Sequence, residues 1–275
     1  MTSNLMGMEL LLDSPKHSPM PNTDLTHSDL LELKRWNTPT IFNGWEQITT
    51  HDVANSCISR EESRDFMPHM GPMIGRAVTV RYRSGNKALK DAADPDNYRR
   101  YLEYVASIEG PKIAVVKDAD GAPFFGSFWG EVNSNVHRAL GCVGTITDGC
   151  IRDLDEMMNA GFKALARRLC VGHGYGHVIQ FGEPEEVFGT PIQSGQLVHA
   201  DKHGFLAIPP EDEAGLLEAA RFMDSNECQT VIPAARGAQG KSTAETLSAI
   251  DQAIAQFRAN TRKQFGRSGE FGSSE

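Results

Sequence analysis

An arginine and an aspartate are neighbours at Arg152 and Asp153, after a stretch typical of a strand and before one typical of a helix. A guanidinium presents a forked pair of donors to the oxygens of a 2-oxo acid, and a carboxylate oxygen is a ligand that hard cations prefer. Residues at a strand-to-helix junction face the pocket at the strand ends of an α/β sheet. The pair therefore predicts a site for a small anion and a divalent metal. The alternative is that Asp153 only caps the helix and that Arg152 is a surface residue.

A second candidate group lies upstream, where Gly130 and Glu131 stand between a strand-like segment and a helix. Glycine has no Cβ, so a ligand can approach its backbone closely. The N–H groups in the first turn of a helix have no partner within that helix, and they can bind an anion such as a carboxylate. The pattern therefore predicts an anion site at this helix start. Glu131 has a plainer interpretation as an acid that stabilises the first turn of the helix.

The elements that must position these residues alternate between strand and helix along the middle of the chain. Short apolar runs rich in β-branched residues predict strands, and apolar residues at helical spacing predict helices. Asp148-Gly149 predicts a turn before Arg152. The predicted strands cover residues 77–82, 113–116, 142–147 and 162–166, and the predicted helices cover about 98–108, 131–140 and 153–160.

The later part of the chain changes character, with short strands separated by glycines over residues 178–208 and two helices after them. The last helix begins with a capping box formed by Ser242 and Glu245. This order of elements predicts one α/β domain with a mixed sheet and helical extensions at both ends. The predicted organisation is a tail over 1–23, the α/β domain over 24–224, a C-terminal helical extension over 225–265 and a second tail over 266–275.

Composition and charge argue against several classes of protein. The net charge is -9 and the chain has no long run of Lys and Arg, so we expect no nucleic-acid partner and no membrane partner. No apolar run has the length of a transmembrane helix, and the N-terminus lacks the pattern of a signal peptide. Five cysteines without a Cys-x-x-Cys pair argue against a disulfide framework. We therefore expect a reducing, cytoplasmic location.

The segment that contains both candidate groups, GEVNSNVHRALGCVGTITDGCIRDLDEMMNAGF, resembles the core signature of the RraA-like family. The early segments GRAVTVRY and KIAVVKD resemble strands of that family, and GQLVHADKHGFLAIP resembles its late hairpin. The resemblance covers roughly residues 37–224. The family includes 4-hydroxy-4-methyl-2-oxoglutarate aldolases, oxaloacetate decarboxylases and regulators of ribonuclease E. The resemblance implies a layered β/β/α domain of the swivelling type.

The resemblance also implies roles for the residues that bind substrate. In the aldolase members, the matching glycine–acid loop binds the carboxylate of the pyruvyl group through backbone N–H groups. By resemblance, Arg152 contacts the keto oxygen of the substrate. The loop residues that match are Gly130, Glu131, Val132 and Asn133.

The metal and the assembly are implied in the same way. The aspartate that matches Asp153 ligates a divalent ion, Mg²⁺ or another such as Mn²⁺, and the acid that matches Glu131 helps to hold metal-bound water. Sites of this family also take an acid from a neighbouring subunit, which we cannot place in this sequence. The resemblance therefore implies a homotrimer or a homohexamer.

Four histidines leave other possibilities open. His199 and His203 alternate with Asp201 and could bind iron or zinc from one side of a strand, but the same residues also suit a hairpin turn. His173 and His177 flank a Gly-Tyr-Gly loop. These two either line the mouth of the substrate site or are simply solvated.

The function that we predict is a metal-dependent carbon–carbon lyase acting on a small 2-oxo acid. It would cleave a 4-hydroxy-2-oxo acid and release pyruvate, decarboxylate oxaloacetate, or do both. The alternative from a different class is a non-catalytic, protein-binding regulator like the ribonuclease regulators, and a third is an iron enzyme that uses His199 and His203. The presence of Arg152, Asp153 and Glu131 together favours the lyase.

Overall fold

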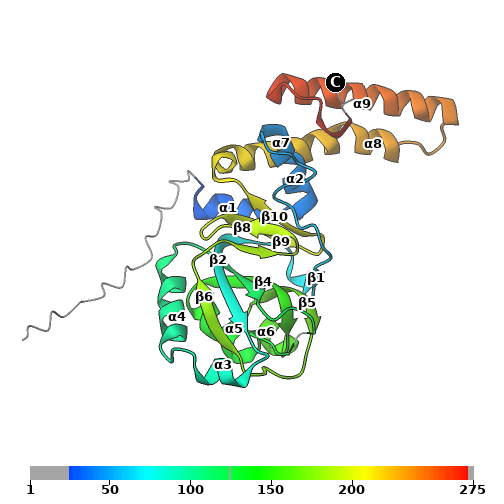
Figure 1. Ribbon diagram of the computed structural model, residues 1–275. Helices are drawn as coiled ribbons and strands as arrows, with labels where there is room; N and C mark the ends of the chain where they lie inside the picture. Colours follow the sequence, from blue (N-terminus) through cyan, green and yellow to red (C-terminus); the bar gives the residue numbers. More distant parts are fainter. Residues whose placement is uncertain (1–24, 124, 272–275) are drawn as a thin grey trace, which may run out of the picture.

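The computed structural model describes residues 25–123 and 125–271, so the predicted tail over 1–23 lies outside the described residues (Figure 1). Its centre is an eight-stranded sheet with the order β1-β5-β4-β3-β2-β9-β10, in which β6 also pairs with β2. A separate pair, β7 and β8, forms a small second sheet. The strands are β1 (Arg64–Asp65), β2 (Met73–Arg83), β3 (Lys112–Asp118), β4 (Cys142–Ile151), β5 (Lys163–Leu169), β6 (His177–Phe181), β7 (Glu185–Val187), β8 (Thr190–Ile192), β9 (Leu197–Asp201) and β10 (Gly204–Ile208).

Four neighbouring strands, β2 to β5, run parallel to one another. Parallel neighbours require crossover connections, which are helical here. Helices α3 (Lys87–Asp91) and α4 (Asn97–Ser107) connect β2 to β3, α5 (Glu131–Ala139) connects β3 to β4, and α6 (Leu154–Asn159) connects β4 to β5. The C-terminal ends of the four strands therefore lie at one edge of the sheet, which is where open α/β sheets bind ligands.

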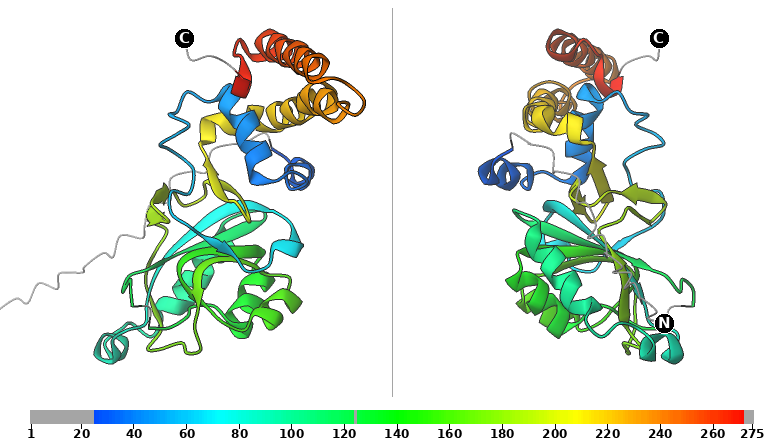
Figure 2. Two further views of the ribbon diagram at one scale, coloured as in Figure 1. Left: turned by 90° about the vertical axis from the view of Figure 1, so that its right-hand side faces the viewer. Right: turned by 60° about the vertical axis from the view of Figure 1, so that its left-hand side comes forward.

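The sheet is covered on both faces, which gives the domain its layers (Figure 2). On one face, Tyr101, Met157 and Phe162 belong to the same buried cluster as Val80 and Val116 of the sheet. On the other face, the β7–β8 pair and the β9–β10 hairpin contribute to a second buried cluster together with β2 to β5. Strands that are covered on both faces are apolar at nearly every position, and this explains the continuous apolar runs of β2 and β3.

Helices from the two ends of the chain form a third core with the β9–β10 hairpin. Trp45 is fully buried there beside Leu206, and its Nε1 donates a hydrogen bond to Asp212 Oδ2 at 2.8 Å. Arg76 of β2 makes two hydrogen bonds to the buried carboxylate of Glu213, at 2.6 and 2.7 Å. The helices are α1 (His27–Leu33), α2 (Thr38–Ile48) and α7 (Glu213–Gln229).

The C-terminal helices α8 (Val231–Arg236) and α9 (Thr243–Phe265) extend from the end of α7 at the top of Figure 1. Asn226 of α7 ties them in, because its Nδ2 donates to the carbonyl oxygen of Phe257 at 3.1 Å. Helix α7 continues to Gln229, so the domain boundary predicted after residue 224 falls inside a helix. Arg267, in the predicted tail over 266–275, donates to the carbonyl oxygen of Thr49 at 2.5 Å. The described part of that segment therefore contacts the protein, and residues 272–275 lie outside the described residues.

The predicted fold, a mixed α/β domain in β/β/α layers with helical extensions at both ends, is confirmed. One local prediction is wrong. The turn predicted at Asp148-Gly149 is part of β4, which continues to Ile151 with a register shift between Thr147 and Cys150. The Asp148 carboxylate is satisfied by the neighbouring strand β3, since it accepts hydrogen bonds from Asp118 N and Lys117 Nζ. A β-bulge thus replaces the turn and aims the next residues into the site.

Candidate active site

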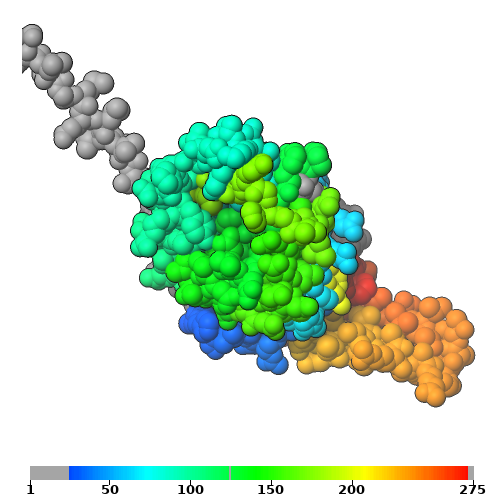
Figure 3. All heavy atoms as spheres, turned by 90° about the horizontal axis from the view of Figure 1, so that it is seen from below, coloured from blue at the N-terminus to red at the C-terminus, as the bar shows by residue number. Residues whose placement is uncertain are grey.

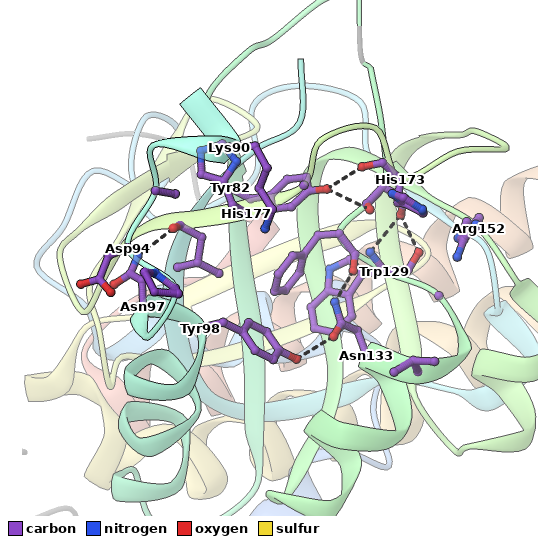
Figure 4. Close-up of a pocket in the computed structure, with 18 of the residues that line it drawn as sticks. Tyr82, Lys90, Asp94, Asn97, Tyr98, Trp129, Asn133, Arg152, His173 and His177 are labelled. Atoms are coloured by element: carbon purple, nitrogen blue, oxygen red, sulfur yellow. Dashed lines mark hydrogen bonds between the residues drawn. The ribbon is translucent and has the colours of Figure 1, made fainter. Parts of the chain in front are cut away.

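A cavity of about 610 Å³ opens at the C-terminal edge of the parallel strands. Figure 3 looks onto the end of the molecule that carries these loops, and Figure 4 shows the lining side chains. The walls come from the end of β2, the α3–α4 region, the start of α5, the residue after β4 and the segment that leads into β6. The lining residues include Tyr82, Lys90, Asp91, Asp94, Asn97, Tyr98, Trp129, Gly130, Val132, Asn133, Arg152, His173 and His177.

Arg152 lies at this mouth because the backbone after β4 is joined to the segment before α5. Its N–H donates to the carbonyl oxygen of Trp129 at 3.3 Å, next to a parallel bridge between Trp129 and Ile151. The guanidinium Nη1 donates to the carbonyl oxygen of Val171 at 3.3 Å, and the side chain is 36% exposed. Its Nε lies 3.6 Å from Asp153 Oδ2. Within the described ranges Nη2 donates to no protein group, so it is available to an anion in the cavity. The structure thus brings Arg152 and Gly130 together, as the sequence pattern predicts.

Asp153 follows in a backbone conformation that side chains rarely adopt, with φ 55° and ψ 52°. A left-handed residue other than glycine costs on the order of 1–3 kcal/mol and is found preferentially at functional sites. It occupies the N-cap position of α6 but makes no side-chain capping hydrogen bond there. Its Oδ2 instead accepts a hydrogen bond from the N–H of Glu131, at 3.1 Å, at the start of α5. Asp153 therefore links the two candidate groups. Its side chain does not cap its own helix.

The start of α5 offers an anion two backbone donors. Glu131 N–H is taken by Asp153, but the N–H groups of Val132 and Asn133 donate to no protein group within the described ranges. The side chain of Asn133 accepts a hydrogen bond from Tyr98 Oη at 2.7 Å. Gly130 leaves room for the side chains of Asp153 and Arg152, since a Cβ at this position would lie 2.6 Å from Asp153 Oδ2 and 3.2 Å from Arg152 Nε. The Glu131 side chain is exposed, and neither Glu131 nor Asp153 is part of the cavity lining.

The wall contributed by β2, α3 and α4 contains functional candidates that sequence reasoning missed. Tyr82 Oη donates to the carbonyl oxygens of Ser127 and His173, both at 3.1 Å, and burial raises the pKa of Tyr82 well above its usual range. Lys90 and Asn97 line the same wall. The sequence signal here is a helix start after Asp94-Pro95. It predicts a helix but does not say which part of the protein that helix packs against.

The local charge at the cavity is positive although the chain as a whole is acidic. Asp91 is paired with Lys87 at 2.6 Å, and Asp94 is paired with Arg100 at 2.6 Å. Lys90 and Arg152 also line the cavity. Arg152 is paired with Asp153 at 3.6 Å, whereas Lys90 has no ion pair among the residues that the structure describes. A pocket of this kind attracts small anions in spite of the overall charge of -9.

The four histidines that the sequence singled out fall into two pairs. His173 and His177 line the cavity. His199 is fully buried in β9, where its Nδ1 lies 2.9 Å from Thr38 Oγ1 and burial lowers its pKa to about 4. His203 contacts Asp201 at 3.1 Å within the β9–β10 hairpin. The His199 contact joins the hairpin to α2 and the His203 contact lies within the hairpin. Neither histidine lines the cavity.

The donor set at the mouth fits a hard, weakly enclosed cation. The carboxylate of Asp153 is 34% exposed, and only its Oδ2 is engaged by a backbone N–H. Mg²⁺ keeps several waters and takes one or two protein carboxylates, and the single carboxylate of Asp153 meets that requirement. Within residues 25–123 and 125–271 there is no cluster of three or more His, Cys, Asp or Glu side chains suited to a metal. A closed site of the structural zinc type is therefore not present in that part of the chain.

The chain matches the model of the RraA-like family, described as Aldolase/RraA, over residues 46–207. This protein therefore belongs to the RraA-like family. It is 24% identical over 142 residues to Protein DlpA of Legionella pneumophila subsp. pneumophila. That match covers 50% of this chain but only 21% of the relative, so the chain spans about a fifth of the relative's length.

Solved structures share the fold. An uncharacterized protein from Pseudomonas syringae pv. tomato superposes with a TM-score of 0.62 at 19% identity, over 84% of this chain and 98% of that chain. Streptomyces coelicolor RraAS2, described as an unusual member of the RNase ES inhibitor RraA protein family, gives 0.57 at 16% identity, over 74% and 95%. At these identities the likeness concerns the fold alone. None of the helices that the structure describes is long and apolar enough to cross a membrane.

Proposed function

We propose that this protein is a divalent-metal-dependent lyase that acts on a small 2-oxo acid. It cleaves a 4-hydroxy-2-oxo acid to release pyruvate, decarboxylates oxaloacetate, or does both. The observation that carries the proposal is that Arg152 and the open first turn of α5 line one cavity. Asp153 lies beside both, with its Oδ2 3.6 Å from Arg152 Nε and accepting a hydrogen bond from Glu131 N–H at 3.1 Å. Membership of a family described as Aldolase/RraA supports it.

The chain's own residues account for recognition of the keto-acid end. The free N–H groups of Val132 and Asn133, at the positive end of α5, bind the substrate carboxylate. Arg152 donates to the keto oxygen and stabilises the negative charge that develops there when a C–C bond breaks. Cleavage of a 4-hydroxy-2-oxo acid and loss of CO₂ from oxaloacetate leave the same pyruvate enolate, so one site serves both reactions.

Asp153, with Glu131 beside it, would hold the metal, which is Mg²⁺ or a similar ion such as Mn²⁺. A bound divalent cation supplies positive charge that polarises the keto group and offsets the negative charges of the substrate. The strained backbone of Asp153 and its bond to Glu131 N–H keep the carboxylate beside Gly130 and Arg152. The chain thus presents the carboxylate to the same end of the substrate that Arg152 contacts.

The test is a panel of 2-oxo acids assayed for pyruvate release with Mg²⁺, in the parent and in Asp153→Asn. Asparagine tolerates a left-handed backbone as aspartate does, so the variant should melt within a degree or two of the parent. Loss of a metal ligand should lower turnover by about 100-fold or more. Asp155→Asn, an exposed acid on the same helix, is the matched control and should behave like the parent. Full activity of Asp153→Asn, or of the parent in excess chelator, would refute the metal-lyase assignment.

The second candidate is a non-catalytic regulator that binds a ribonuclease of the E type. The description of the S. coelicolor structure, which shares the fold, favours considering it. Binding to such a ribonuclease together with no turnover of any 2-oxo acid in the panel would select this alternative. For either function we propose a homotrimer or homohexamer. We also propose that nucleic acid is not a partner, since the net charge is -9.

A further inference from the structure

His177 presents a free ring nitrogen to the cavity. Its Nδ1 lies 3.0 Å from the carbonyl oxygen of Tyr175. A carbonyl oxygen only accepts hydrogen bonds, so Nδ1 carries the proton in the neutral ring and Nε2 carries the lone pair. Nε2 has no hydrogen-bond partner among the residues that the structure describes. The ring is therefore held in the tautomer in which Nε2 acts as a base.

The position of this histidine is fixed by the sheet. His177 is the first residue of β6 and is paired with Arg83 of β2, next to a register shift between Arg81 and Tyr82, so its backbone is held by the sheet. His173 has the same tautomer, with Nδ1 at 2.8 Å from the carbonyl oxygen of Gly174, but it is exposed and lies in the preceding loop. Figure 4 shows His177 and Lys90 on one side of the cavity and Arg152 on the other.

The charged groups around His177 form no ion pair with it among the residues that the structure describes. Lys90 of α3 lines the same cavity, and Arg83, the partner of His177 on β2, is paired with Asp120 at 3.2 Å. The two acids of the α3–α4 segment that line the cavity are also paired, Asp91 with Lys87 and Asp94 with Arg100, both at 2.6 Å. Nearby carboxylates are thus bound to other cations. His177 Nε2 has no ion pair or hydrogen bond within the described ranges, so its lone pair can accept a proton.

We propose that His177 is the general base and general acid of the cleavage reaction. The inference rests on the proposed lyase function. With the keto end held by Arg152, carbon 4 of the substrate extends toward the opposite wall. Nε2 takes the proton of the 4-hydroxyl group, the C3–C4 bond breaks, and its electron pair forms the enolate while carbon 4 becomes a carbonyl. The same proton then passes to C3 of the enolate, which yields pyruvate and restores the neutral ring.

The first measurement compares two reactions in His177→Gln. Cleavage of a 4-hydroxy-2-oxo acid needs a base, whereas CO₂ leaves oxaloacetate without one. Turnover in cleavage should therefore fall by about 10²–10⁴-fold, and loss of CO₂ should fall much less. A merely structural role would lower both reactions alike. His203→Gln, in the β9–β10 hairpin, is the matched control and should retain both activities.

The second measurement follows proton transfer without C–C cleavage. Exchange of the methyl protons of pyruvate in D₂O, observed by NMR, should be lost in His177→Gln while pyruvate still binds. His177→Asn and melting temperatures check that the protein stays folded. Parent-like cleavage and exchange in folded His177→Gln and His177→Asn would overturn the inference and leave the lyase proposal standing. Loss of exchange in His173→Gln but not in the His177 variants would have the same consequence. A parent that neither cleaves nor exchanges any 2-oxo acid would overturn the lyase proposal and this inference with it.

Discussion

Gly130→Ala tests whether the site depends on the close approach of α5 to the residues after β4. A Cβ at this position would lie 2.6 Å from Asp153 Oδ2 and 3.2 Å from Arg152 Nε, whereas ordinary contact begins at 3.4 Å. The Asp153 carboxylate must therefore retreat by 3.4 − 2.6, or 0.8 Å. The substitution causes no backbone strain, because φ at Gly130 is -174° and alanine readily adopts an extended conformation.

The magnitude follows from that displacement. Misplacing catalytic groups by about 1 Å can cost about 100-fold in rate, so kcat/KM for pyruvate release should fall by about that factor. The free energy of unfolding should change by less than about 1 kcal/mol, because the atoms that move are the ends of half-exposed side chains. The assay is steady-state kinetics alongside urea unfolding.

A glycine elsewhere provides the control. Gly215 lies in α7, and a Cβ there would meet Ile48 Cδ1 at 3.4 Å, which is ordinary contact. Gly215→Ala should keep parent activity and stabilise the helix by up to about 1 kcal/mol. If Gly130→Ala folded normally and retained the parent's kcat/KM, the positions of Asp153 and Arg152 would not matter in the way that we argue.

Two further predictions concern stability. Glu213→Ala removes the carboxylate of the buried Arg76–Glu213 pair and should lower the free energy of unfolding in urea by about 3–5 kcal/mol. The double variant Arg76→Met/Glu213→Leu should lower it by less than the sum of the two single changes. Strict additivity would show that the two groups do not interact. Burial lowers the pKa of His199 from 6.5 to about 4, so as the pH falls the unfolded chain is protonated at this histidine before the folded protein is. The stability contributed by the neutral ring is therefore complete above pH 6.5 and is lost as the pH falls to about 4. His199→Gln should lose on the order of 3 kcal/mol less than the parent over that range, and equal losses in the two proteins would contradict this origin.

Much of the fold could be predicted because its periodicities are local. Residues 113–116 are apolar at every position, as expected for a strand covered on both faces, and they lie inside β3. The capping box of Ser242 and Glu245 opens α9, with Ser242 Oγ bound to Glu245 N at 3.3 Å. Each of these signals involves residues close together in the sequence, which is why a single chain reveals them.

The site was predictable only in part. Spacing and resemblance led to Arg152, Asp153 and Gly130, and the structure brings these residues together. The hydrogen bond from Glu131 N–H to Asp153 could not be foreseen, because it joins residues that are 22 positions apart and depends on the left-handed backbone of Asp153. The wall around Lys90 was missed for a similar reason. Which crossover segment folds over the strand ends is decided by tertiary packing, which local pattern does not encode.

The third core, between the terminal helices and the β9–β10 hairpin, bears on what the smallest independent folding unit of this protein is. The family match spans 46–207 and omits α1, α7 and most of α2. Leu197 and Leu206 are fully buried beneath those helices, and β10 is the last strand of the sheet path. A fragment cut at the family limits would expose this apolar face on an edge strand, a combination that promotes aggregation. Expression boundaries for work on the site should therefore include both flanking helical segments, even though neither reaches the cavity.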